Sequence, residues 1–75
     1  MAFSDNLREA REKHGYSQKE LAKFVGISQQ AVFIFEKGRK LPNIITGVEL
    51  ANALGTTAEN LVNGTDEKRE QSDNP

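Results

Sequence analysis

The stretch from Ser17 to Glu36 contains two helix start signals separated by a single glycine. Ser17 followed three residues later by Glu20 is a capping box, in which the hydroxyl and the carboxylate each accept a backbone N–H that the helix leaves free. Apolar residues follow at helical spacing, at Leu21, Ala22 and Val25. Gly26 comes directly after them, where glycine adopts a left-handed backbone at little cost. The pattern therefore predicts a short helix that ends at Gly26.

A second short helix is predicted immediately after this glycine. Ser28 is a suitable N-cap, and a rotation of about 100° per residue divides the segment that follows into two faces. The face predicted to point inward holds Val32, Phe35 and Glu36, and the outward face holds Gln30, Phe33, Ile34 and Lys37, with Gln29 at the border. Two helices that cross in this way bury their apolar faces together and leave one face of the second helix free.

The two glutamines at the start of the second helix are suited to reading DNA. A glutamine amide offers one donor and one acceptor, which match N6 and N7 of adenine in the major groove. The helix N-terminus carries partial positive charge, which favours a nearby phosphate. We therefore interpret the segment as the recognition helix of a helix-turn-helix DNA-binding protein.

Four segments of the chain resemble, in order and in spacing, the phage-repressor/Cro family of helix-turn-helix domains, also called the XRE family. They are Gln18–Ala22, Gly26–Val32, Phe35–Pro42 and Leu50–Gly55, and the resemblance spans roughly residues 5 to 63. One glycine-centred helix pair alone is weak evidence, but four segments at the family's spacing are specific. The resemblance implies an all-α fold, a compact five-helix bundle of the lambda-repressor-like type, with the helix-turn-helix at its second and third helices.

The expected DNA contacts fall into two groups. Base contacts are predicted for Gln29, Gln30, Phe33 and Ile34, and the resemblance implies phosphate contacts by Ser17, Gln18, Lys37, Arg39 and Lys40. The alternatives for the second group are a solvated surface glutamine and a solvated run of charges.

Phe33 and Ile34 depart from the small or polar residues usual in the family at these positions. Ile34 can contact a thymine methyl group. For Phe33 the alternatives are a contact with a sugar, packing on Tyr16 or Phe24, or a face that binds another protein.

Arg11 and Glu36 are expected to form a structural ion pair. Both fall on inward faces of their helices, where an unpaired charge is costly. The resemblance implies that the arginine of the first helix pairs with the acid that ends the recognition helix. The alternative is that both side chains reach solvent separately.

Three further helices complete the expected bundle. The first is capped by Ser4 or Asp5 and ends at Gly15. The fourth begins after Asn43 and buries Ile44, Val48, Leu50, Ala51 and Leu54, with Gly47 leaving room for a neighbour such as Phe35. The last is capped by Thr57 and ends at Gly64. The predicted domain covers residues 1–65, and the polar residues 66–75 are expected to be a disordered tail.

Composition excludes several classes of protein. The chain has 75 residues, no cysteine and one histidine, so it has no disulfide framework and no evident metal site, cofactor or catalytic group. No apolar run is long enough to cross a membrane, and we expect a cytoplasmic protein without a small-molecule ligand.

The formal net charge of −1 argues at first against nucleic acid. Residues 17–40, however, hold five Lys and Arg against two Glu, a local charge of +3.

The leading interpretation is a sequence-specific transcriptional regulator, expected to be a repressor, that binds double-stranded DNA as a two-fold homodimer. Leu61 and Val62 cannot both face the core of so small a bundle, so this end is the expected dimer interface. The alternative is a protein-interaction module on the same fold, such as an antitoxin- or antirepressor-like partner that binds through Phe33 and Ile34. A third reading is a DNA-binding piece whose regulatory domain lies elsewhere.

Overall fold

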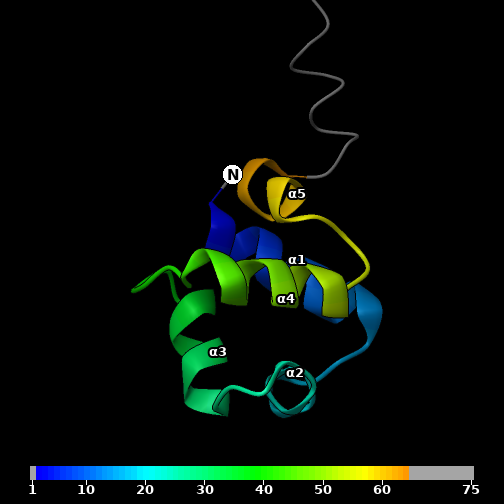
Figure 1. Ribbon diagram of the computed structural model, residues 1–75, viewed down its shortest axis with the longest axis vertical. Coiled ribbons are helices and arrows are strands. Elements are labelled where there is room, and N and C mark those ends of the chain that lie inside the picture. The colour runs from blue at the N-terminus through cyan, green and yellow to red at the C-terminus, as the bar shows by residue number, and fades with distance from the viewer. Residues whose placement is uncertain (1, 65–75) are drawn as a thin grey trace, which may run out of the picture.

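The computed structural model describes residues 2–64, which form five helices and no strand (Figure 1). In chain order they are α1 (Phe3–His14), α2 (Gln18–Val25), α3 (Gln29–Glu36), α4 (Ile44–Ala53) and α5 (Ala58–Asn63). The expected all-α, five-helix fold is therefore confirmed. The boundary at residue 65 and the predicted tail of residues 66–75 lie outside the described residues.

Short polar side chains define where four of the helices begin. The side chains of Ser17, Ser28, Asn43 and Thr57 each accept a hydrogen bond from the backbone N–H three residues later, at 3.0, 3.0, 2.8 and 3.0 Å. At α2 the capping box is complete, because the Ser17 N–H donates to the Glu20 carboxylate at 2.8 Å. All four caps were predicted from the sequence.

The start of α1 differs from the prediction. The helix begins at Phe3 after an extended Ala2, and no side chain caps it. The Ala2 carbonyl already accepts the N–H of Asn6 at 3.1 Å, so the first turn closes before Ser4 or Asp5 could act as a cap. Asp5 instead lies in the first turn, where a carboxylate favours the helix dipole, and it pairs with Arg8 at 3.5 Å.

The turn between α2 and α3 depends on Gly26. This residue has φ +87°, a left-handed conformation that side chains disfavour. The N–H groups of Gly26 and Ile27 both donate to the Ala22 carbonyl, at 2.8 and 3.0 Å. The chain therefore leaves α2 and enters α3 within a few residues, and Figure 1 shows α2 nearly end-on while α3 lies across it.

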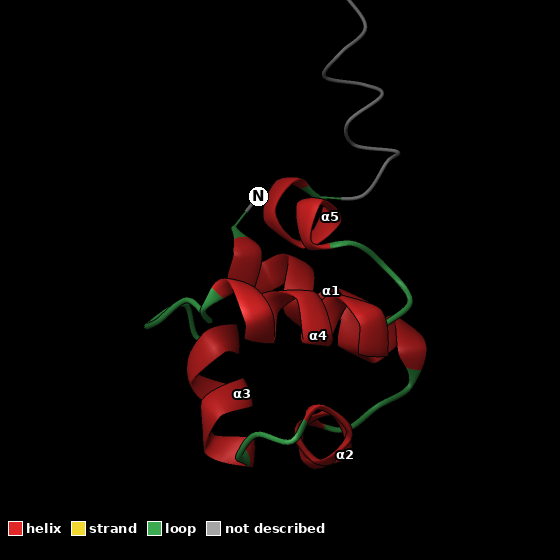
Figure 2. Cartoon of the chain, in the orientation of Figure 1, coloured by secondary structure: helices red, strands yellow, loops and turns green. Residues whose placement is uncertain are grey.

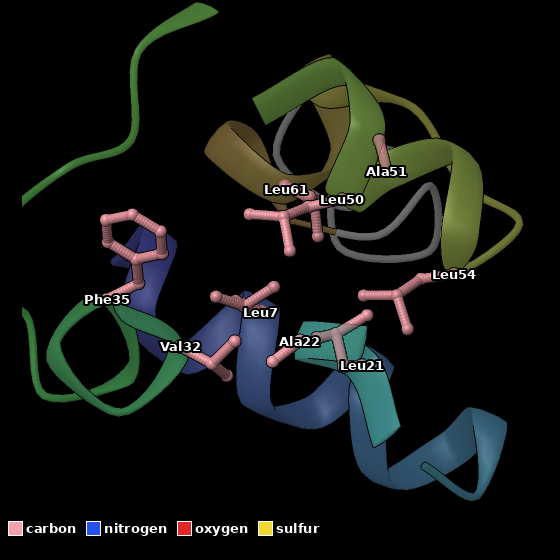
Figure 3. Packing of buried hydrophobic residues seen from close by; sticks show 9 residues of the cluster. All are labelled: Leu7, Leu21, Ala22, Val32, Phe35, Leu50, Ala51, Leu54 and Leu61. Carbon is pink, nitrogen blue, oxygen red and sulfur yellow. The ribbon is translucent and has the colours of Figure 1, made fainter. Parts of the chain in front are cut away.

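The core draws on all five helices. Its buried apolar residues are Leu7, Leu21, Ala22, Val32, Phe35, Leu50, Ala51, Leu54 and Leu61, whose side chains converge on the centre of the bundle (Figure 3). One buried polar group joins the first helix to the last, because the Asn6 amide donates to the Leu61 carbonyl at 2.8 Å. The role of Asn6 was not predicted from the sequence.

The first half of α4 lies outside this core. Ile44 and Val48 were predicted to be buried, but they are 82% and 43% exposed. The reason is that α4 packs mainly on α2 and α5, and the residues buried there are Leu50 and Ala51 in its second half and Leu54 at its C-cap.

A neighbouring side chain was expected to fill the space beside Gly47, but none does. A Cβ added there meets no atom within 4 Å. The space beside it is open, and Phe35 does not occupy it.

Gly47→Ala is expected to raise the free energy of unfolding by about 0.5–1 kcal/mol, because alanine restricts the unfolded chain and suits a helix interior. Gly26→Ala is the matched control. A Cβ at Gly26 also meets nothing within 4 Å, but the φ of +87° is unfavourable for alanine, so this variant should lose about 1–2 kcal/mol. Urea denaturation of both variants measures the difference, and equal effects at the two sites would contradict it.

Candidate nucleic-acid interface

The third helix presents its polar N-terminus to solvent. Val32, Phe35 and Glu36 are buried and Gln30 is exposed, as predicted, and Gln29, predicted at the border between the two faces, is exposed too. α3 packs on α1 and α2 along its buried side. The two glutamine side chains are therefore available on a helix that is held from behind.

Phe33 and Ile34 are half-buried and do not point freely outward. The ammonium of Lys37 lies 5.5 Å from the centre of the Phe33 ring, within range of a cation–π contact. Tyr16 packs elsewhere, against His14 at 4.6 Å and Phe24 at 5.6 Å between ring centres. The outward face of α3 is therefore less apolar than its sequence suggests.

Arg11 and Glu36 form the predicted ion pair in a bidentate geometry. The Arg11 Nε donates to Glu36 Oε2 at 2.6 Å, and Nη2 donates to Oε1 at 3.1 Å. Their side chains are only 12% and 4% exposed, so the alternative of two separate solvated charges is wrong. The hydrogen bond to Glu36 raises the pKa of the Arg11 guanidinium above its ordinary value, which favours the charged form that the pair needs.

The same carboxylate and guanidinium bind two further groups. Gln18 Nε2 donates to Glu36 Oε1 at 3.0 Å, and Arg11 Nη1 donates to the Tyr16 carbonyl at 2.9 Å. This network joins α1, the start of α2 and the end of α3. Neither additional bond was predicted from the sequence, although an amide next to a helix cap was a signal that could have suggested the first.

Gln18 was predicted to contact phosphate and is half-buried. One amide N–H is committed to Glu36, and a glutamine amide has a second N–H that remains a donor. Ser17, beside it, is exposed at the start of α2. The contact of both residues with phosphate remains a prediction.

The loop after α3 carries the remaining predicted phosphate contacts. Lys37, Arg39 and Lys40 are exposed, and Figure 2 shows the loop extending away from the bundle. Gly38 has φ +75°, and a Cβ there would lie 3.3 Å from Ser4 Oγ, so glycine satisfies both the turn and the close approach of α1.

The charge of this region is positive. Glu36 is the only acid between Gln29 and Lys40, and it is buried and paired. The exposed charges from α3 through the loop are therefore those of Lys37, Arg39 and Lys40.

The expected dimer residues separate in the structure. Leu61 is 2% exposed and belongs to the core, whereas Val62 is 57% exposed. Leu61 is therefore the one of the two that faces the core, and its side chain is not available for pairing. A dimer contact by Val62 remains a prediction.

Residues 2–64 were also searched for a metal site, a membrane-spanning helix and a ligand groove. No group of three or more His, Asp or Glu side chains in this range is placed to hold a metal ion. None of its helices is long and apolar enough to span a bilayer. A groove of about 760 Å³ lies between α1 and the α4–α5 connection, lined in part by His14 and Thr56, away from α3.

The fold and the exposed α3 define a helix-turn-helix domain. The HTH_3 helix-turn-helix family matches residues 7–61 of the chain. The chain therefore belongs to this family of transcriptional regulators, which is the phage-repressor/Cro-like family that its sequence resembles.

Two curated relatives carry matching names. An HTH-type transcriptional regulator derived from the SPbeta prophage of Bacillus subtilis, YonR, is 36% identical over 63 residues, covering 84% of this chain and 58% of the relative. The HTH-type regulator y4dJ of Sinorhizobium fredii is 42% identical over 62 residues, covering 83% and 80%. The chain thus spans little more than half the length of the first relative.

Solved structures give the same fold. The P22 c2 repressor in complex with synthetic operator 9T matches with a TM-score of 0.82 and 28% identity, covering 87% of this chain and 98% of that one. The restriction-modification controller protein C.AhdI of Aeromonas hydrophila matches with a TM-score of 0.75 and 32% identity, covering 79% and 89%.

Glu36→Ala is expected to lower the free energy of unfolding by about 3 kcal/mol, because it leaves the largely buried Arg11 guanidinium without its counter-ion. Glu12→Ala is the control. Glu12 is exposed on α1 and near enough to Arg11 to act on its charge, but its removal should change stability by less than about 0.5 kcal/mol. Chemical denaturation distinguishes the two, and comparable losses would show that the contact with Glu36 is not special.

Proposed function

We propose that this protein regulates transcription in the cytoplasm by inserting α3 into the major groove of double-stranded DNA. The observation that carries the proposal is the exposure of Gln29 and Gln30 at the start of a helix whose other end is held by the Arg11–Glu36 pair. The P22 c2 repressor, which has the same fold, was solved in complex with an operator. That likeness supports the same mode of binding here.

Base recognition is assigned to the outward face of α3. Gln29 and Gln30 each have the donor and acceptor that match adenine. Phe33 and Ile34 are half-buried, so the exposed parts of these two side chains are suited to shallow contact with thymine methyl groups rather than to deep insertion.

Phosphate recognition is assigned to the two ends of the motif. Ser17 and Gln18 lie at the start of α2, where free N–H groups and the helix dipole favour an anion. Lys37, Arg39 and Lys40 supply charge from the loop after α3. Because phosphate contacts carry no sequence information, these residues set orientation and affinity rather than specificity.

The protein is proposed to bind as a homodimer with two-fold symmetry. Two copies of α3 would then lie in successive major grooves about 34 Å apart, on a nearly palindromic site. A single small domain with a modest positive face binds weakly, and two linked copies increase affinity without new types of contact.

The alternative of a protein-interaction module that uses Phe33 and Ile34 is less well supported. Half-burial of both residues, with the Lys37 ammonium over the Phe33 ring, leaves this face little continuous apolar surface. The local charge favours a nucleic acid.

Gln30→Ala and Gln29→Ala are each expected to weaken binding to a selected operator by about 1–3 kcal/mol and to flatten preference at one base position. The operator is obtained by selection from a random DNA pool, and binding to it is then measured for each variant. Asn63→Ala is the control, because it removes an exposed side-chain amide from α5, outside the basic segment of residues 17–40. Unchanged specificity in both glutamine variants would refute base reading by α3.

Arg39→Ala is expected to weaken binding to all sequences alike and to reduce the slope of log affinity against log salt by about 1, because one phosphate contact is lost. Titration of random double-stranded DNA at two or more salt concentrations measures the slope. A wild-type protein whose affinity for DNA does not depend on salt would overturn the proposed function itself.

A further inference from the structure

Lys37 is held by a neighbouring side chain, unlike the two cations that follow it. Its ammonium lies 5.5 Å from the centre of the Phe33 ring. Within the described residues 2–64, the side chains of Arg39 and Lys40 form no hydrogen bond, ion pair or ring contact. Of the three exposed cations that leave α3, Lys37 alone therefore has a partner in this part of the chain.

The contact between Phe33 and Lys37 follows from their positions on the helix. Lys37 is the C-cap of α3 and keeps a right-handed helical backbone, with φ −85° and ψ −6°. Side chains four residues apart on a helix are neighbours on its surface, and a cation at the C-terminal end is favoured by the helix dipole. Phe33 is half-buried, so the bundle restricts its ring. A restricted ring thus limits the movement of an otherwise flexible side chain.

The acid next to Lys37 in the chain does not compete for its ammonium. Glu36 is 4% exposed and pairs with Arg11, and its other oxygen also accepts a hydrogen bond from Gln18. No ion pair joins Glu36 to Lys37 within residues 2–64. The ring is therefore what positions the ammonium.

We propose that Phe33 is a positioning residue for DNA binding, whose ring orders the Lys37 ammonium for contact with a phosphate. This inference rests on the proposed function and adds a second role to a residue assigned there to base contact. An ammonium has three N–H donors, so one that lies over a ring still has donors for a phosphate oxygen. Fixing a long side chain on binding lowers affinity, and here part of that ordering is already present in the free protein.

The two roles of Phe33 have different consequences for binding. An apolar side chain that touches a thymine methyl group changes the preference at one base position. A residue that orders a phosphate contact changes the affinity for every sequence by the same factor, because phosphates carry no sequence information. The effect of Phe33 on affinity is therefore expected to depend on the presence of Lys37.

Replacement of the ring tests this inference first. Phe33→Leu keeps an apolar side chain but removes the aromatic face, and it should weaken binding to random double-stranded DNA and to the selected operator by the same factor, about two- to tenfold. Phe33→Tyr keeps a ring face and should stay within about twofold of wild type. Circular dichroism and thermal melting confirm that the variants fold.

A double-mutant cycle then identifies the residue through which the ring acts. In a Lys37→Gln background, Phe33→Leu should change affinity for random DNA by less than about 1.5-fold, because the partner of the ring is already gone. Arg39→Ala is the matched background, since it removes a cation of the same loop that does not contact the ring. There the full effect of Phe33→Leu should persist.

Nuclear magnetic resonance of the free protein measures the contact without DNA. The methylene protons beside the Lys37 ammonium should be shifted upfield by the ring of Phe33. The shift should disappear in Phe33→Leu and persist in Phe33→Tyr.

Every other result counts against the inference. An absent upfield shift, or an equal effect of Phe33→Leu with and without Lys37, overturns it. A change of preference at one base position, with affinity for random DNA unchanged, also overturns it and leaves Phe33 as a base contact only. In these cases salt-dependent binding by the wild-type protein still supports the proposed function. A wild-type protein that shows no such binding overturns the function and this inference together.

Discussion

The bidentate pair between Arg11 and Glu36 is the constraint on which the arrangement of the helices depends. A helix of eight residues has little stability alone, and the buried Val32 and Phe35 fix which face of α3 points inward but not how the helix is tilted. The fork of the guanidinium fixes the end of α3 against α1, and the Gln18 amide ties the start of α2 to the same carboxylate. A single acid thereby sets the relative positions of both helices of the motif, and its own charge is buried.

Local chemistry made much of this fold predictable, and tertiary packing explains what was not. The caps at Ser17, Ser28, Asn43 and Thr57 form between residues three apart, so the sequence contains all the information they need. The error at the start of α1 arose because an extended Ala2 can begin a helix without any polar side chain. The error at Ile44 and Val48 has a different cause. Helical periodicity gives the direction of an apolar stripe, but it does not reveal whether another helix lies beneath it.

The candidate site was likewise predicted only in part. The exposure of Gln29 and Gln30 followed from the phase of a short helix that two buried apolar residues determine. The half-burial of Phe33 and Ile34 did not follow, because it depends on neighbours such as Lys37, whose ammonium lies over the Phe33 ring. The separation of Leu61 from Val62 was foreseen only as a choice between them, since it is the packing of α5 on α1 and α4 that selects Leu61.

The close approach of Ser4 to Gly38 links the first turn of the chain to the exit from α3. The space beside Gly38 that a side chain would need is already taken by the serine, so these two segments cannot shift independently. A segment fused ahead of Ser4 that displaces the first turn is expected to disturb the exit from α3, where Arg39 and Lys40 follow Gly38. Affinities measured on protein with an added N-terminal extension will therefore report on the seating of that turn as well as on the DNA.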